Sequence, residues 1–95
     1  MRLEDLRRLR PRIDELARRH GAARIRVFGS TARGTADETS DVDFLVDLEP
    51  GRSLLDLGGL LADLEDLLGL PVDVVTPAGL EPRIRARVID EAVAL

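Results

Sequence analysis

The sequence predicts an α/β fold of the mixed α+β kind, in which helices flank a small mixed β-sheet. Two observations lead to this prediction. Apolar residues recur at helical spacing in three segments, and three short segments with the composition and alternation of strands lie between or beside them. At 95 residues, without a repeat or a linker, the chain has the length of one domain, so we interpret residues 1–95 as a single domain.

Composition excludes several classes of protein. The chain has no Cys, which rules out disulfides and thiolate metal sites, and all 14 of its basic residues are Arg, which rules out a lysine nucleophile. A net charge of −4 and only two aromatic residues argue against a nucleic-acid-binding surface. No apolar run approaches the roughly 18 residues of a membrane span. We therefore expect a cytoplasmic protein that does not enter membranes.

The first predicted helix covers residues 3–17, where leucine and isoleucine return every three or four positions. Pro11 interrupts this pattern and predicts either a kink or two short helices. His20 and Gly21 end the segment, with Gly21 expected as the C-terminal cap.

Two strand candidates follow. Residues 24–28 alternate, with Ile25 and Val27 on one face, and lead directly into a Gly-Ser pair. After one helical turn or less and a polar loop, residues 41–48 alternate again. In that segment the apolar side chains of Val42, Phe44 and Val46 share one face, and the other face carries Asp41, Asp43, Leu45 and Asp47.

The second half of the chain predicts a helix, a strand and a helix. Ser53, with Asp56 three residues later, resembles a capping box, and leucines at helical spacing extend from there to residue 68. Gly69 is expected to end this helix. Residues 71–75 form a short third strand, and the last helix is expected to begin near Pro82.

The first chemically informative feature is the Gly29-Ser30 pair at the end of a strand. Glycine there permits an unusual backbone turn and the close approach of a ligand. Ser30 is expected to cap the following helical turn, where its hydroxyl and backbone N–H groups would bind a phosphate. Arg33 could add a charge-assisted contact to the same phosphate, or form a simple surface ion pair.

The second feature is a set of aspartates. Asp41 and Asp43 are two residues apart on a strand and therefore project from the same face. Carboxylates about 5 Å apart repel by roughly 3 kcal/mol at an effective dielectric near 20, and a shared proton or a divalent cation relieves the repulsion. Oxygen ligands alone favour Mg²⁺ or Mn²⁺. Asp73 joins them if its strand pairs with the strand of Asp41 and Asp43, and such a set suits phosphoryl or nucleotidyl transfer.

At these residues the chain resembles a known family. Gly29-Ser30, ten residues from Thr31 to Ser40, and then Asp41-Val42-Asp43 are similar to the signature of the DNA polymerase β-like nucleotidyltransferases. The string from Phe28 to Gly34, with Val72–Pro77 and Ile89–Val93, most resembles the minimal nucleotidyltransferases. Several of those act as antitoxins beside toxins that contain a HEPN-type ribonuclease domain.

The resemblance implies residue roles. Asp41, Asp43 and Asp73 would be the catalytic carboxylates and would hold two Mg²⁺ ions, with Mn²⁺ as a substitute. Gly29, Ser30 and Arg33 would bind the nucleotide, which would be ATP. The acceptor of AMP would be a hydroxyl, a tyrosine on a cognate HEPN-type toxin. Larger relatives have a second domain, so we expect a partner protein to complete the site. Whether the chain also forms a homo-oligomer is left open by the resemblance.

Two alternatives remain at this point. The chain could be a non-catalytic nucleotide-binding module that neutralises its partner by stoichiometric contact. It could also be a small-molecule nucleotidyltransferase, although a small acceptor needs walls that a single domain of this size lacks. Replacing Asp41 and Asp43 separates catalysis from binding.

Overall fold

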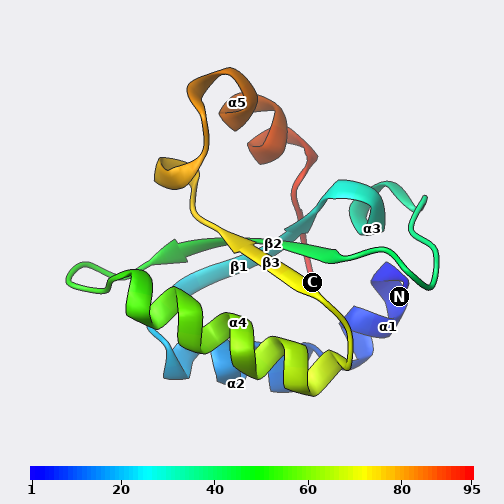
Figure 1. Ribbon diagram of the computed structural model, residues 1–95, viewed down its shortest axis with the longest axis horizontal. Coiled ribbons are helices and arrows are strands. Elements are labelled where there is room, and N and C mark those ends of the chain that lie inside the picture. Colours follow the sequence, from blue (N-terminus) through cyan, green and yellow to red (C-terminus); the bar gives the residue numbers. More distant parts are fainter.

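The computed structural model describes all 95 residues, in the order of helices and strands that Figure 1 labels. The helices are α1 (Leu3–Arg8), α2 (Arg10–Arg19), α3 (Gly29–Arg33), α4 (Leu54–Leu68) and α5 (Pro82–Glu91), with a 3₁₀ turn η1 (Pro77–Gly79). The strands are β1 (Ala22–Phe28), β2 (Val42–Leu48), β3 (Val72–Val75) and β4 (Val93–Ala94).

The strands form one mixed sheet in the order β3-β2-β1-β4. β1 is antiparallel to β2 and to β4. β2 and β3 are parallel, because α4 carries the chain from the end of β2 back to the end of the sheet at which β2 begins. The predicted fold class is therefore confirmed. The prediction of three strands was wrong by one, since β4 has only two residues and is too short to show a periodic pattern.

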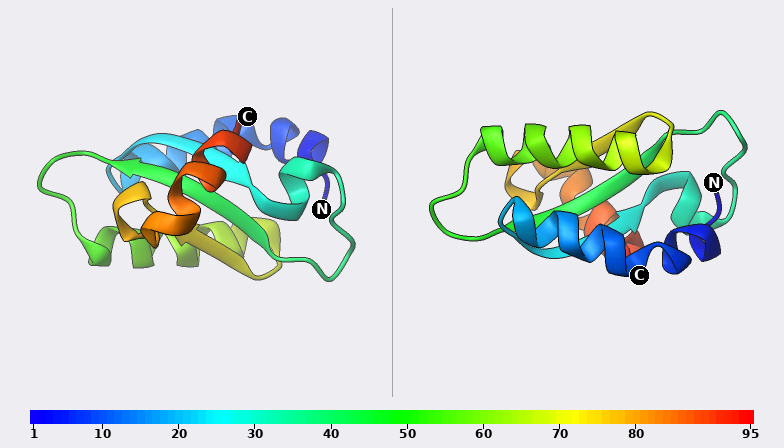
Figure 2. Two further views of the ribbon diagram at one scale, coloured as in Figure 1. Left: turned by 90° about the horizontal axis from the view of Figure 1, so that it is seen from above. Right: turned by 90° about the horizontal axis from the view of Figure 1, so that it is seen from below.

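One face of the sheet, which we call the α4 face, carries the main hydrophobic core. Helices α2 and α4 run side by side across it, as the right view of Figure 2, seen from below, shows. The alternating residues of β2 and the buried leucines of the helices meet there in a cluster of twelve side chains. They are Leu6, Ile13, Ala17, Ala22, Val27, Val42, Phe44, Val46, Leu60, Leu64, Leu68 and Val72.

The N-terminal helical segment is divided, as one of the two readings of Pro11 predicts. α1 ends at Arg8 and α2 begins at Arg10, with Leu9 between them at φ −91° and ψ 2°. Pro11 lies in the first turn of α2, where its missing N–H leaves no hydrogen bond unmade. Gly21 follows the end of α2 with a φ of 76°, which confirms the expected left-handed cap.

α4 has the termini that its sequence predicts. The Ser53 side chain accepts a hydrogen bond from the backbone N–H of Leu55, and the backbone N–H of Ser53 donates to the Asp56 carboxylate at 2.9 Å. Gly69 ends the helix in the left-handed conformation. This helix links β2 to β3 and so brings Asp73 next to the strand that carries Asp43.

The opposite side of the sheet, the α5 face, is covered differently. α5 and the short η1 turn lie over it, set above the strands in Figure 1, and α5 crosses the strands in the left view of Figure 2, seen from above. Leu45 and Val88 are buried outside the main cluster, and Arg26 is buried with one ion pair to Asp47 at 3.5 Å. No helix of the structure has the length and apolar character needed to cross a membrane.

Candidate active site

The turn from β1 into α3 is built around Gly29. Phe28 ends the strand in an extended conformation, and Gly29 then takes a φ of 74°, which side-chain-bearing residues rarely adopt. A Cβ on residue 29 would also collide with the Oδ2 atom of Asp43, whose strand partner is Phe28. Glycine at this position therefore lets the Asp43 carboxylate lie directly against the turn.

Ser30 lies within the first turn of α3, and the predicted capping role is wrong. The N-cap is Phe28, and no side chain caps this helix. α3 ends after Arg33, where Gly34 takes a φ of 78° and its N–H donates to the carbonyl of Thr31. The half-buried Ser30 instead lies next to Gly29 at the mouth of the turn, and its carbonyl accepts a hydrogen bond from the N–H of Thr35 at 3.0 Å.

Asp43 is the central carboxylate of the α5 face. It is half-buried on β2, and burial raises the pKa of its carboxyl group above the usual value. The negative charges of Asp73 and then of Asp41 raise this pKa further, whereas the guanidinium of Arg33 lowers it. The other two aspartates singled out from the sequence therefore act electrostatically on Asp43.

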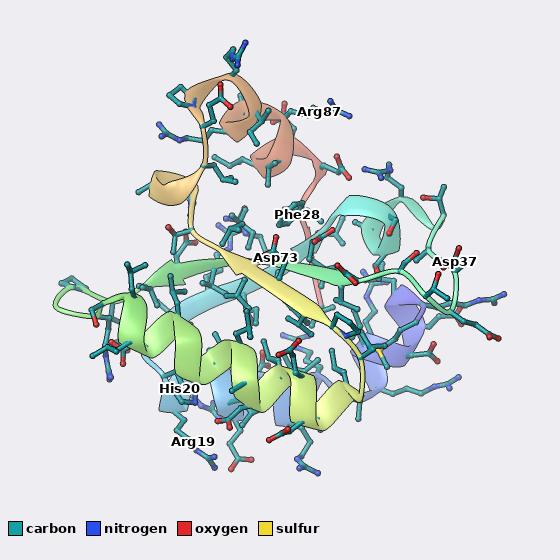
Figure 3. The ribbon with its side chains drawn as sticks, viewed as in Figure 1. Arg19, His20, Phe28, Asp37, Asp73 and Arg87 are labelled. Carbon is teal, nitrogen blue, oxygen red and sulfur yellow. The ribbon has the colours of Figure 1, made fainter.

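The sheet brings Asp73 to Asp43 by register. The two residues are paired across the parallel β2–β3 ladder, and Figure 3 shows Asp73 and Phe28 on the side of the sheet that α5 covers. Asp73 is exposed, and so is Asp41, which directly precedes β2. The predicted convergence of the three aspartates depended on pairing between these two strands, and that pairing is present.

The fit of this site to a metal ion depends on its donors. As the side chains stand, no group of three or more His, Asp or Glu residues is gathered tightly enough to hold a metal ion. Mg²⁺, however, usually keeps several waters and binds through one or two carboxylates together with substrate phosphates. Asp41, Asp43 and Asp73 offer hard oxygen ligands of this kind at one edge of the sheet, so the donor chemistry fits Mg²⁺.

Arg33 is beside these carboxylates and is already paired. Its guanidinium donates to a carboxylate oxygen of Glu91, the last residue of α5. Sequence reasoning did not single out Glu91, although it lies within the C-terminal segment Ile89–Val93 that resembles the minimal nucleotidyltransferases. Its partner is 58 residues away, a separation at which periodicity carries no signal.

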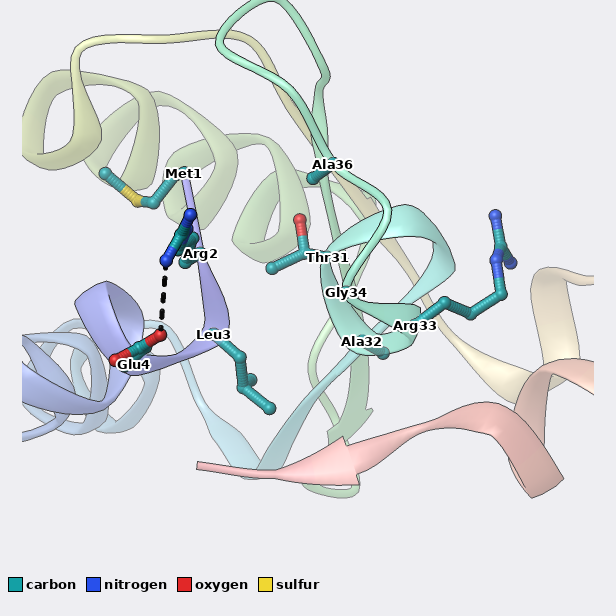
Figure 4. A pocket seen from close by; sticks show the side chains of 9 residues that line it. All are labelled: Met1, Arg2, Leu3, Glu4, Thr31, Ala32, Arg33, Gly34 and Ala36. Carbon is teal, nitrogen blue, oxygen red and sulfur yellow. Dashed lines mark ion pairs between the residues drawn. The ribbon is translucent and has the colours of Figure 1, made fainter.

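Two pockets touch α3. The larger, about 360 Å³, lies between α3 and the start of the chain; Figure 4 shows Thr31 beside it and the Arg33 side chain directed away from it. It contains none of the three aspartates. The other, about 210 Å³, lies between α3 and α5 on the α5 face. Its lining is Phe28, Gly29, Arg33, Ile84, Arg87, Val88 and Glu91, so it adjoins the turn that contacts Asp43.

Comparison with known protein families agrees with this geometry. The family model described as a nucleotidyltransferase domain matches residues 6–95, which is nearly the whole chain. The chain belongs to the nucleotidyltransferase-domain family. It is therefore a nucleotidyltransferase, and the family suggested by the Gly-Ser and Asp-x-Asp spacing is confirmed.

Two curated relatives of this nucleotidyltransferase cover most of its length. The protein adenylyltransferase MntA of Thermococcus cleftensis is 49% identical over 79 residues, which are 83% of this chain and 80% of the relative. A candidate protein adenylyltransferase of Methanocaldococcus jannaschii is 40% identical over 89 residues, or 94% of this chain and 96% of the relative.

Solved structures share the fold. A candidate minimal nucleotidyltransferase is 54% identical with a TM-score of 0.88, and the match covers 100% of this chain and 97% of that one. A toxin–antitoxin structure with AMP-PNP is 24% identical with a TM-score of 0.74, covering 86% of this chain and 68% of that one. The second similarity is one of fold alone.

Proposed function

We propose that this nucleotidyltransferase transfers AMP from ATP to a hydroxyl group on a partner protein. The observation that carries the proposal is the close fit of the Gly29 turn against Asp43, in register with Asp73, in a chain of this family. Two relatives at 40% and 49% identity are named for protein adenylylation, which supports a protein acceptor.

Each polar residue of the site has a proposed part. Asp41 and Asp43, with Asp73 beside them, would hold Mg²⁺, or Mn²⁺ in its place. A bound metal ion would neutralise the negative charge that the triphosphate develops during transfer. The glycine at position 29 lets the Asp43 carboxylate lie directly against the turn where a phosphate would bind, and Ser30 offers a hydroxyl donor at the same turn. Arg33 would contribute a fixed positive charge.

In the transfer itself, the acceptor oxygen forms a bond to the α-phosphorus of ATP. The bond from that phosphorus to the bridging oxygen of pyrophosphate breaks, and pyrophosphate leaves with the electron pair. The proton of the acceptor hydroxyl passes to a carboxylate, for which Asp73 is our candidate, because it is exposed at the open edge of the α5 face.

The acceptor we propose is a tyrosine on a cognate HEPN-type ribonuclease toxin, so that AMP transfer in the cytoplasm silences the toxin and the chain acts as its antitoxin. A toxin–antitoxin structure that contains a protein called MntA shares this fold at 19% identity and a TM-score of 0.72. The relative of this chain at 49% identity carries the same name, MntA. Those names motivate the choice of partner.

A labelling experiment tests the proposed function. The chain is incubated with Mg²⁺, ATP labelled at the α-phosphorus and the product of the neighbouring gene. We expect label on that protein, released pyrophosphate, and no label when Asp41 and Asp43 are both replaced by Ala. Absence of label on any protein, with ATP and with the three other nucleoside triphosphates, would contradict the proposal.

A second candidate function is neutralisation by stoichiometric binding, with a regulatory nucleotide site. It is favoured by one observation, namely that the aspartate side chains are not gathered into a group that could hold a metal ion. The same double variant separates the two functions. If Asp41→Ala with Asp43→Ala still protects cells from the partner, binding rather than catalysis neutralises it.

A further inference from the structure

The C-terminal end of α5 is tied to α3 by a single ion pair. Arg33 ends α3 and Glu91 ends α5, and the guanidinium of the first donates to the carboxylate of the second. The side chain of Glu91 is 20% exposed and that of Arg33 is 50% exposed. The acidic partner is thus the more buried of the two, and the basic partner keeps part of its surface open to solvent.

This ion pair belongs electrostatically to the aspartate site. The carboxyl group of Asp43 responds to both members, since the guanidinium of Arg33 lowers its pKa and the carboxylate of Glu91 raises it. Arg33, Glu91 and Gly29 also line the same 210 Å³ pocket between α3 and α5. Gly29 is the residue against which Asp43 lies. The pair therefore faces the place where the phosphates of a nucleotide would meet the aspartates.

An unpaired arginine at this position would be a poor phosphate donor. Its long side chain samples many rotamers, and ordering it on ligand binding opposes affinity. Glu91 removes that freedom in advance and occupies only part of the guanidinium, whose five N–H groups form a planar fork. The only ion pair that Arg33 makes is with Glu91, so its other N–H groups are left free of any carboxylate. The exposed Arg33 and its partner at the end of α5 together give a pre-oriented cation.

We propose that Glu91 is a positioning residue, which holds the Arg33 guanidinium beside Asp43 so that the phosphate end of the nucleotide meets an oriented donor. This inference rests on the proposed function only in taking ATP as the substrate. It assigns a role to α5 that neither the Gly-Ser pair nor the aspartates require.

Affinity for ATP in the presence of Mg²⁺, measured by calorimetry on the full chain, tests the inference. We expect Glu91→Gln to weaken binding about 10-fold, the size of a charge-assisted contact, and Glu91→Asp to recover part of the loss. In an Arg33→Gln background, Glu91→Gln should have no additional effect, because Glu91 acts through Arg33. An effect of Glu91 on ATP affinity that does not depend on Arg33 would be the same in both backgrounds and would overturn the inference.

Asp90→Asn is the matched control. Asp90 is the exposed neighbour of Glu91 on α5, makes no ion pair, and loses the same charge in the variant. We expect its ATP affinity to equal that of the wild type. Equal weakening by Asp90→Asn would overturn the inference, as would tighter binding by Glu91→Gln, which would mean that Glu91 withholds Arg33 from the nucleotide.

The design separates this inference from the proposed function. Normal ATP binding without transfer to any protein would contradict the proposed function. The ATP affinities of the Arg33 and Glu91 variants could still be compared, so the inference about Glu91 would still be tested. A wild-type chain that binds no ATP would overturn both. Thermal melts of all variants without nucleotide identify any variant that has lost its fold, and Glu91→Asp then serves as the deciding variant.

Discussion

The two faces of the sheet are built from the same strands, but one holds the apolar core and the other carries the charged residues of the site. On the α4 face, Val42, Phe44 and Val46 of β2 are at most 1% exposed and belong to the main core. On the α5 face, the intervening residues of the same strand include the half-buried Asp43, whose pKa is raised by burial and by the negative charges of Asp73 and Asp41. Alternation thus lets one strand anchor the fold on one side and present charge on the other.

The difference shows where each face is vulnerable. The α4 face is covered by α2 and α4, and the clustered side chains between them and the sheet are all apolar, so those residues act through packing. The α5 face has one helix, a buried arginine and several carboxylates, so its residues act through charge. Substitutions on neighbouring residues of β2 should therefore have effects of different kind and even of opposite sign.

The largest effect is expected on the α4 face. Phe44→Ala removes the largest fully buried side chain and leaves a cavity in the core, which should lower the free energy of unfolding by about 3–5 kcal/mol. Urea unfolding followed by circular dichroism measures the loss. A loss below about 1 kcal/mol would mean that the two faces contribute alike, and the comparison would fail.

A smaller loss is expected from Asp47→Asn on the α5 face. Asp47 is the ion-pair partner of Arg26, whose side chain is 10% exposed and whose Nε atom has no hydrogen-bond partner. Removing the anionic charge leaves that buried guanidinium without compensation, at an expected cost of about 1–3 kcal/mol. The same urea measurement checks this. Unchanged stability would show that Arg26 is satisfied without Asp47.

Asp43→Asn should have the opposite sign. Because the pKa of Asp43 is raised in the folded chain, the folded state binds more protons than the unfolded state as pH rises from the usual value near 3.8 through the raised one. Stability is therefore lost as pH rises through that range. Without metal at neutral pH, Asn should stabilise the chain by about 0.5–1 kcal/mol and remove this pH dependence.

The same variant should lose its catalytic activity. If Asp43 holds the metal, AMP transfer should fall on the order of 10³-fold, and Mg²⁺ should no longer raise the melting temperature. Melting curves with and without Mg²⁺, with labelling by ATP, provide the measurements. A destabilised Asp43→Asn chain would contradict the assignment of Asp43 to function rather than to folding.

The smallest effect is expected at the start of α4. Leu54 and Leu55 are 82% and 87% exposed, so Leu55→Gln should change the free energy of unfolding by no more than about 0.5 kcal/mol. Thermal melts over a range of protein concentrations check this. A loss that depends on concentration would show that a second copy of the chain covers these leucines.

Much of the α4 face could be predicted because its physics is local. Two-residue alternation in β2 and helical leucine spacing in α4 depend on neighbours in sequence, and the cap at Ser53 depends on residues three apart. Gly29, Asp41 and Asp43 could be singled out for the same reason. The prediction of Ser30 as a cap was wrong because the N-cap of α3 is Phe28, two residues earlier in the chain.

The sequence by itself determined the order of the longer strands and helices, the Gly-Ser turn and the aspartates that identify the family, because each depends on residue types at short spacing. Tertiary structure alone decided that Asp73 lies in register with Asp43, that the Asp43 carboxylate leaves no room for a Cβ at position 29, and that Glu91 pairs with Arg33. These contacts join residues brought together only by strand pairing and by the return of α5 over the sheet. Long-range charge pairs leave no period in a sequence, so only the folded chain reveals them.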